Sequence, residues 1–224
     1  MGKEALEKVF LYWLCHLPSA GALQIRLIGE EAGGFREAYY IEGTQLWKKG
    51  ILKKETDAHR FDDWKKEFSR LEEEYYRLSE KGICFITPLD EMYPSRLYSV
   101  YDYPMGLYVK GNLPQEDKAT AAVIGARNCT AYGREAANYM ARELAAAGIQ
   151  IISGMALGID GAGHEGALNG GGMTYAVLGC GVDQCYPRSN YELYETIPFH
   201  GGLISEYALK TPPLPRNFPI RNRI

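Results

Sequence analysis

Three glycine-bearing turns, each directly after a short apolar run, have the clearest chemical potential in this chain. The turns span residues 125–128, 153–160 and 179–183, and the apolar runs before them span 121–124, 149–152 and 175–178. Such runs are typical of parallel strands that are covered on both faces. Ligands bind outside the carboxyl ends of such strands, where glycine lets a phosphate approach the backbone. The spacing therefore predicts one shared binding site.

Arg127 is the charged residue of the first turn, just before a helix expected over residues 131–147 with Thr130 as its N-cap. A guanidinium, the free N–H groups of a helix N-terminus and the helix dipole all favour an anion such as phosphate. A second role, bonding a nearby carbonyl or pairing with a surface carboxylate, is equally open. The turn lacks both the G-x-G-x-x-G pattern and a Walker lysine.

Asp160 and His164 follow the second turn and share a helix face because they are four residues apart. They have the chemistry of an acid/base pair or of two metal ligands. A cap for Asp160 and a structural hydrogen bond for His164 are favoured instead, since no third ligand is near in sequence. We therefore expect no catalytic residue and no metal, and expect Ser153, Asp160 and His164 to support the site.

The third turn and the C-terminal tail carry further groups suited to nucleic acid. Arg188 has a donor fork for phosphate and Tyr186 a ring for stacking on a base, although an ordinary turn before a helix is the alternative. The tail, residues 217–223, combines arginines, an aromatic residue and amides in what we expect to be a loop. Such a combination of side chains can bind a single strand; the alternative is that the tail is a disordered basic end.

The elements that position these turns alternate between strand and helix from residue 120 onward. A helix over 131–147 is expected to bury one stripe and to end at Gly148; the stripe is Ala136, Met140, Leu144 and Ala147. Further helices are expected from about residue 160 and over 191–199, and strands at 83–87, 107–110 and 203–205. This order predicts an α/β fold with an open, mostly parallel sheet.

Residues 1–80 differ in composition from the rest of the chain, because they are rich in charged and aromatic residues and show helical periodicity. One amphipathic helix is expected from residue 61 to 81, where Gly82 ends it. We therefore expect two domains, a helical one over 1–80 and an α/β one over 81–224.

Composition narrows the class of protein. The chain of 224 residues has a net charge of -3, so any nucleic-acid site must be a local patch rather than a general basic field. Its five cysteines include no C-x-x-C pair, which is typical of reduced cytosolic thiols. The N-terminus reads as an amphipathic helix rather than a signal peptide, and no run is long enough to span a membrane. We expect a cytoplasmic protein without a membrane partner.

Taken together, these motifs resemble the DNA processing protein A family, DprA or Smf. The matching elements, which run over about residues 83–224, are Gly125-Ala126-Arg127, Ser153-Gly154-x-Ala156-x-Gly158-Ile159-Asp160, His164-x-Gly166-Ala167-Leu168, Tyr186-Pro187-x-x-Asn190, Ser205-Glu206-Tyr207 and Phe218-Pro219-x-Arg221-Asn222-Arg223-Ile224. Residues 17–21 resemble the hairpin of the family's small helical domain but lack its usual second glycine.

The resemblance implies an extended Rossmann-like domain that dimerises and binds single-stranded DNA without strong sequence preference. It implies a recombination mediator that helps to load a RecA-type recombinase during natural transformation, with no enzymatic activity and no cofactor. The helical domain would be of the SAM or helix-hairpin-helix type. Since the family's sheet continues with further strands, the sheet over 81–224 is expected to be incomplete at its C-terminal end.

The resemblance also implies the contacts to DNA. Arg127, Arg221 and Arg223 match arginines of the family's motifs, whereas Met173 stands where a basic residue is frequent. The residues expected to bind DNA are Gly125, Arg127, Asn128, Gly154, Gly158, Gly181, Tyr186, Arg188, Arg221, Asn222 and Arg223, with Gly154, Gly158 and Gly181 shaping the pocket floor. The alternative from another class is a nucleotide-binding hydrolase that uses Asp160 and His164.

Overall fold

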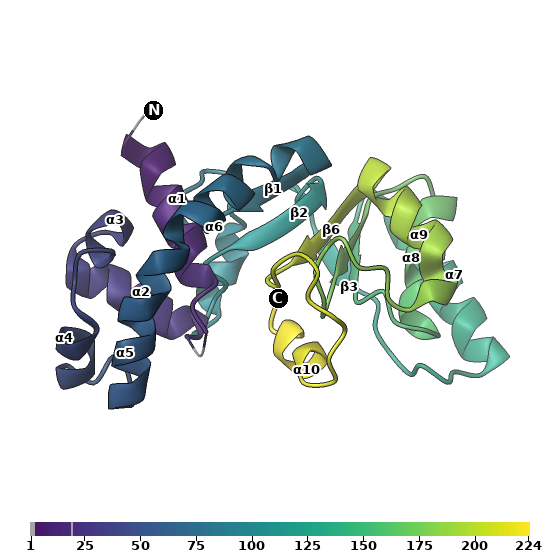
Figure 1. Ribbon diagram of the computed structural model, residues 1–224. Helices are drawn as coiled ribbons and strands as arrows, with labels where there is room; N and C mark the ends of the chain where they lie inside the picture. The colour runs from purple at the N-terminus through teal and green to yellow at the C-terminus, as the bar shows by residue number, and fades with distance from the viewer. Residues whose placement is uncertain (1–2, 19) are drawn as a thin grey trace. The chain divides into compact units, whose positions relative to one another are not determined.

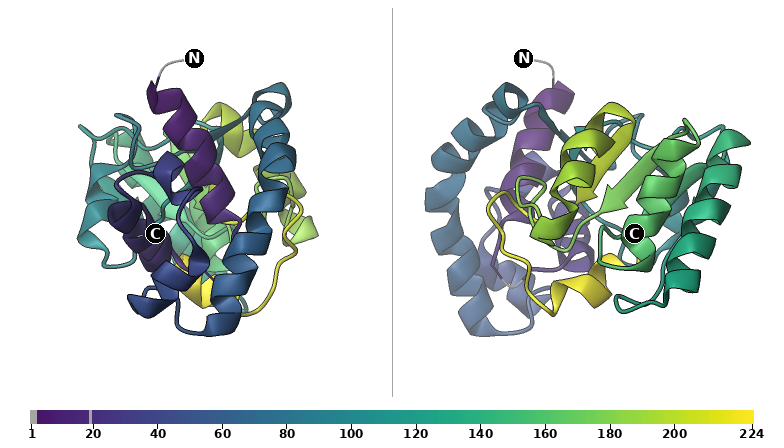
Figure 2. Two further views of the ribbon diagram at one scale, coloured as in Figure 1. Left: turned by 60° about the vertical axis from the view of Figure 1, so that its left-hand side comes forward. Right: turned by 90° about the vertical axis from the view of Figure 1, so that its right-hand side faces the viewer.

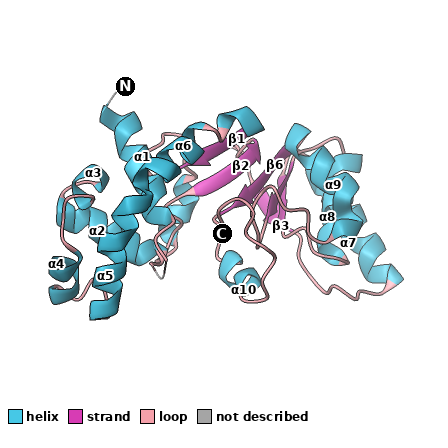
Figure 3. Ribbon diagram, in the orientation of Figure 1, coloured by secondary structure: helices cyan, strands magenta, loops and turns pink. Residues whose placement is uncertain are grey.

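The computed structural model describes residues 3–18 and 20–224, which leaves Ser19 of the expected hairpin outside the described residues. Contacts divide the chain into two compact units. The N-terminal unit comprises Met1–Lys81 with Phe85–Gly106, and the C-terminal unit comprises Gly82–Cys84 with Leu107–Ile224. The first is mainly helical and the second combines strands with helices (Figures 1 and 3).

The N-terminal unit is built around α1, whose apolar residues from Val9 to Leu14 are buried. Its helices are α1 (Lys3–Cys15), α2 (Ala22–Ala32), α3 (Phe35–Ala38), α4 (Gly43–Lys48), α5 (Glu55–Trp64) and α6 (Phe68–Tyr76). Two tryptophans join α1 to α5 reciprocally. The indole of Trp13 donates to the carbonyl of Trp64 at 3.0 Å, and that of Trp64 donates to the carbonyl of Trp13 at 3.2 Å.

The prediction of one helix from residue 61 to 81 is wrong, because a 3₁₀ turn over Lys65–Glu67 separates α5 from α6. The Trp64 carbonyl, which an uninterrupted helix would bond to Phe68, accepts from Trp13 instead. The N–H of Phe68 bonds the Lys65 carbonyl. The segment is amphipathic as expected, since Phe61, Leu71 and Leu78 are buried while most of its charged residues are not.

The described residues contain one six-stranded sheet, with strand order β1-β2-β6-β5-β4-β3. The strands are β1 (Ile83–Ile86), β2 (Leu107–Gly111), β3 (Thr120–Ala122), β4 (Gln150–Ser153), β5 (Thr174–Val177) and β6 (Gly201–Ser205). β3, β4, β5 and β6 run parallel, and β2 pairs antiparallel with β6. The expected α/β fold with a mostly parallel sheet is confirmed.

β3 lies at the edge of the sheet, and the parallel strands β4, β5 and β6 follow it inward in chain order. The connections are α7 (Ala131–Ala146) between β3 and β4, and α8 (Ile159–Asn169) between β4 and β5. α7, α8 and α9 (Tyr191–Thr196) lie together along one side of the strands (Figures 1 and 2). This order is one half of a doubly wound sheet, and it brings the carboxyl ends of β3, β4 and β5 to one edge.

The buried stripe of α7 differs from the prediction. Ala137, Ala141 and Ala145 are buried, whereas Met140 is 60% exposed. The reason is the facing helix α8: a Cβ on Gly166 would stand 2.2 Å from the Asn138 carbonyl oxygen. The two backbones are in contact, so only alanine fits on the facing side of α7. The N-cap is as predicted, since the Thr130 hydroxyl accepts from the N–H of Gly133 at 3.1 Å.

The tail is not the loop that was expected, because Asn217–Arg221 forms the short helix α10. Pro219 falls in the first turn of that helix, where its missing N–H removes no helical hydrogen bond. As a result Phe218, Arg221 and Asn222 have fixed directions.

Candidate functional site

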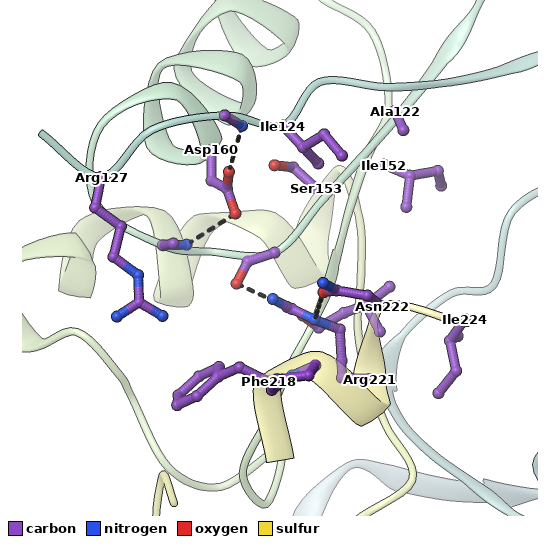
Figure 4. A pocket seen from close by; sticks show the side chains of 15 residues that line it. Ala122, Ile124, Arg127, Ile152, Ser153, Asp160, Phe218, Arg221, Asn222 and Ile224 are labelled. Atoms are coloured by element: carbon purple, nitrogen blue, oxygen red, sulfur yellow. Dashed lines mark hydrogen bonds between the residues drawn. The ribbon is translucent and has the colours of Figure 1, made fainter. Parts of the chain in front are cut away.

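A pocket of about 790 Å³ lies at the carboxyl ends of β3, β4 and β5, and all of its lining belongs to the C-terminal unit. α10 forms one wall (Figure 4). The polar lining includes Arg127, Ser153, Asp160, Arg221 and Asn222, and the apolar lining includes Ala122, Ile124, Ile152, Val177, Phe218 and Ile224. The structure thus brings the first two turns together with α10, whereas no residue of the third turn, 179–183, is among those that line the pocket.

Asp160 joins the first turn to the second. Its carboxylate is buried and accepts from the N–H of Gly125 and from the N–H of Ala156, each at 3.4 Å (Figure 4). Ser153 adds a link of its own by donating to the carbonyl of Val123 at 2.6 Å. Both carboxylate oxygens of Asp160 therefore hold backbone, which is the structural role that the sequence favoured.

Arg221 reaches from α10 to the ends of two strands. Its Nη1 donates to the carbonyl of Gly154 at 3.0 Å and to the carbonyl of Val177. Its Nε donates to the side chain of Asn222 at 3.1 Å. Burial lowers the pKa of this guanidinium, and the charge of Arg127 lowers it further. Arg221 therefore fixes the floor of the pocket while adding positive charge to it.

Arg127 is the exposed cation of the site. Its guanidinium carbon lies 5.3 Å from the centre of the Phe218 ring, and the Tyr186 ring lies 5.7 Å from the same ring. Arg127 is not in an ion pair with any described residue. The side chain is thus supported by an aromatic surface while its charge stays available to a ligand.

His164 lies outside the pocket lining and is fully buried. Its Nδ1 lies 2.7 Å from the Thr174 hydroxyl, which itself donates to the carbonyl of Ile151. Nδ1 is therefore the protonated nitrogen, and Nε2 finds no partner among the described residues. Burial lowers the pKa of His164 to about 3, and the charge of Arg221 adds to that shift.

Several residues predicted for the site lie outside its lining, and they are Asn128, Gly158, Gly181, Tyr186, Arg188 and Arg223. Arg223 pairs with Glu206 at 2.7 Å, and Gly158 packs against the carbonyls of Ala126 and Arg127. Met173 precedes β5, at the end opposite to the pocket, and its sulfur accepts from the Tyr175 hydroxyl at 3.5 Å. Arg188, by contrast, is exposed.

Two asparagines that hold the turns were missing from the predicted site. Asn190 donates to the carbonyls of Met155 and Ala156, at 2.9 and 3.2 Å, and Asn217 donates to the carbonyl of Gly179 at 3.0 Å. Met155 is buried with φ of 62°, a left-handed conformation that costs a non-glycine residue energy. Asn190 stabilises that strained turn. The available signal was its place after a turn, where amides frequently bond backbone.

No three His, Cys, Asp or Glu side chains within residues 3–18 and 20–224 are grouped to hold a metal ion. No helix in that same part of the chain is long and apolar enough to cross a membrane. All five cysteines are free thiols.

The chain is similar in sequence to curated proteins named DprA and Smf. The chain is 38% identical over 146 residues to DNA processing protein DprA of Bacillus subtilis, covering 65% of this chain and 49% of that protein. It is 39% identical over 154 residues to protein Smf of Escherichia coli, covering 65% of this chain and 41% of that protein. The chain therefore spans about half the length of the curated relatives it matches.

Solved structures are similar as well. The X-ray structure of DNA processing protein A from Streptococcus pneumoniae matches with a TM-score of 0.77 and 29% identity, over 97% of this chain and 72% of that one. DNA processing protein A from Helicobacter pylori, whose structure concerns its single-stranded DNA binding mode, matches with a TM-score of 0.56 and 32% identity over 62% of each chain.

The family model for DNA recombination-mediator protein A matches residues 84–224, which contain every residue of the pocket. The chain belongs to the DNA recombination-mediator protein A family.

Proposed function

We propose that this chain binds single-stranded DNA at the pocket, with a backbone phosphate at Arg127. The observation that carries the proposal is the convergence of two guanidinium groups, Arg127 and Arg221, on one pocket. Asp160 is the only acid among the described residues that line it, and its oxygens accept from backbone N–H groups. The two guanidinium groups outweigh this one carboxylate, so the net charge of the pocket lining is positive, which favours a phosphate.

The aromatic residues at the pocket support a single strand rather than a duplex. Phe218 lines the pocket, and Tyr186 lies beside it with 41% of its surface exposed. A single strand can turn its bases onto such rings, whereas the bases of a duplex are stacked on one another. The remaining predicted contacts, which include Asn128, Arg188 and Arg223, are proposed as a wider path for the strand around this pocket.

We further propose that the bound strand is passed to a RecA-type recombinase during DNA uptake in natural transformation. The family to which the chain belongs supports this role. In this proposal a helical domain over residues 1–80 accompanies a Rossmann-like DNA-binding domain over 81–224. The protein acts in the cytoplasm as a homodimer, without a cofactor and without catalysing a reaction.

A hydrolase that uses Asp160 and His164 fits the geometry less well. His164 is buried outside the lining, and its protonated nitrogen faces Thr174. Asp160 accepts two backbone hydrogen bonds, so moving it toward a substrate would release two turns. A general base must reach the proton that it takes. His164 does not reach the pocket, and the carboxylate of Asp160, although it lines the pocket, is occupied by backbone N–H groups.

The test is fluorescence anisotropy with labelled oligo-dT and with a duplex of equal length, across a salt series. We expect the single strand to bind more tightly than the duplex at every salt concentration, and log Kd to depend linearly on log salt. Equal affinity for the two forms at the same salt would refute the proposal. Incubation with nucleoside phosphates and divalent metal ions tests the hydrolase in parallel, because turnover lost in Asp160→Asn would favour that function.

A further inference from the structure

A cluster of lysines between α4 and α5 of the N-terminal unit takes no part in the pocket. Four of the seven residues from 48 to 54 are lysines, and we call this segment the lysine loop. All four side chains are exposed, and they are Lys48, Lys49, Lys53 and Lys54. Because the chain as a whole has a net charge of -3, this loop is a local basic patch on a protein without a general basic field.

Nearby acids neutralise only part of this charge. Lys49 pairs with Glu31, whereas the other three lysines of the loop are in no ion pair with any described residue. Two acids stand in the first turn of α5, and one of them, Asp57, pairs with Arg60 at 3.6 Å. The other acid, Glu55, is a single negative charge beside three unpaired ammonium groups, so the loop keeps a positive net charge.

The stability of the helices accounts for only part of the lysine loop. Lys48 stands in the last turn of α4, where the helix dipole favours a cation. Lys54, by contrast, is the N-cap of α5 and makes no capping hydrogen bond, and the dipole disfavours a cation at that end of a helix. Lys53 and Lys54 therefore do not stabilise the helix that they precede, which leaves them free to serve in binding.

The two helices on either side hold the lysine loop in place (Figure 1). A Cβ on Gly43 of α4 would stand 2.2 Å from the carbonyl oxygen of Ala58 in α5, so the two backbones are in contact. The N–H of Gly43 also donates to the carboxylate of Asp62 at 3.0 Å. Within the loop, the carbonyl of Ile51 accepts from the side chain of Gln24 at 3.4 Å. The lysines are thus carried by a supported turn rather than by a flexible tail.

We propose that the lysine loop binds the backbone phosphates of duplex DNA. The inference rests on the proposed function, which makes DNA the polyanion that this chain meets. Ammonium groups attract phosphates without reading bases, and a duplex carries about one negative charge per 1.7 Å of its axis. A single strand depends on stacking its bases, but Trp47 is the one aromatic residue within 47–54 and is only 36% exposed. The N-terminal unit thereby gains a duplex contact that is separate from the single-strand pocket.

Fluorescence anisotropy of the full chain with a blunt duplex and with oligo-dT, across a salt series, tests the proposal. The double variant Lys53→Gln/Lys54→Gln loses two phosphate contacts, so the log–log salt slope for the duplex should fall by roughly 1.8. The slope for oligo-dT should stay that of the wild type. Lys66→Gln/Lys81→Gln is the matched control, because it removes the same charge from exposed positions of the same unit outside the loop. Circular dichroism checks that both variants are folded.

Three results would overturn the assignment. They are a duplex slope that is unchanged in the loop variant, a duplex slope that falls equally in the control, and an oligo-dT slope that falls as much as the duplex slope. The last result would make the loop part of the path of the single strand. Arg127→Ala keeps the two proposals apart, because it should lower the slope for oligo-dT and leave the slope for the duplex unchanged. If oligo-dT binding ignores Arg127→Ala, the pocket assignment fails, whereas a lysine effect on the duplex still supports the duplex contact.

Discussion

The guanidinium of Arg127 lies on the ring of Phe218, with 5.3 Å between its central carbon and the ring centre. These residues come from opposite ends of the pocket-forming sequence, one from the loop after β3 and the other from α10. A flexible side chain on a loop is thereby given a preferred direction, at a gain of about 0.5–1 kcal/mol for an exposed cation–π contact. The proposed phosphate contact is thus partly organised before DNA arrives.

Replacing Arg127 by alanine should weaken DNA binding without unfolding the protein. The side chain is exposed, and its loss removes one phosphate contact, so the log–log salt slope should fall by roughly 0.7. Anisotropy with oligo-dT measures the slope. Arg134→Ala is the matched control, because Arg134 is exposed in the same unit but outside the pocket. A slope that stays unchanged in Arg127→Ala would remove Arg127 from the phosphate site.

Replacing Arg221 by methionine should destabilise the C-terminal unit. Methionine cannot donate a hydrogen bond, so the buried carbonyls of Gly154 and Val177 lose the donor that Arg221 provides. We expect the free energy of unfolding to fall by about 2–3 kcal/mol. Urea denaturation measures this loss. Arg216→Met serves as control, since Arg216 is exposed just before α10. Equal stability of the two variants would show that Arg221 is not a structural link.

Replacing His164 by asparagine should reduce the sensitivity of stability to acid. The pKa of His164 is about 3 in the folded chain and about 6.5 when unfolded, so between these values only the unfolded chain binds the proton. Above pH 6.5 this group takes nothing from the free energy of unfolding. As the pH falls below 6.5, the free energy of unfolding decreases by about 1.4 kcal/mol per pH unit. Asparagine keeps a donor near Nδ1 but cannot titrate.

Melting temperatures from pH 7 to pH 4 check this expectation. The wild type should lose stability more steeply than His164→Asn, and His59→Asn should follow the wild type because His59 is exposed. Parallel curves for the wild type and His164→Asn would contradict the low pKa.

Replacing Gly166 by alanine should push α7 away from α8 and thereby lower the free energy of unfolding. The new Cβ would stand 2.2 Å from the Asn138 carbonyl oxygen, and overpacking of this kind costs about 1–3 kcal/mol. The better helix propensity of alanine offsets less than about 1 kcal/mol of this. Glu165→Ala, at an exposed position of the same helix, is the control in urea denaturation. A Gly166→Ala variant that is as stable as the control would show that the helices can move apart freely.

The sequence predicted the positions of the strands because they are short, largely apolar runs, and those of the turns because glycine follows closely after β3, β4 and β5. It also placed Arg127 in a turn and Asp160 at the start of a helix, since those positions depend on neighbours in sequence. The partners of Arg221 could not be predicted, because Gly154 lies 67 residues away and is reached only after the sheet has formed. The face of α7 was mistaken for a related reason: the glycines of α8 decide which side chains fit between the helices.

The position of β3 at the edge of the sheet has a consequence for the form of DNA that can enter. Ala122 at the end of that outer strand and Ile124 in the loop after it are exposed, and both line the pocket. In the chain of 224 residues the site opens sideways, so it can receive the middle of a polymer, whereas a tunnel would need a free end to thread. Circular single-stranded DNA should therefore bind as tightly as a linear strand of equal length, and a strong preference for the linear form would show that strand ends are what the pocket recognises.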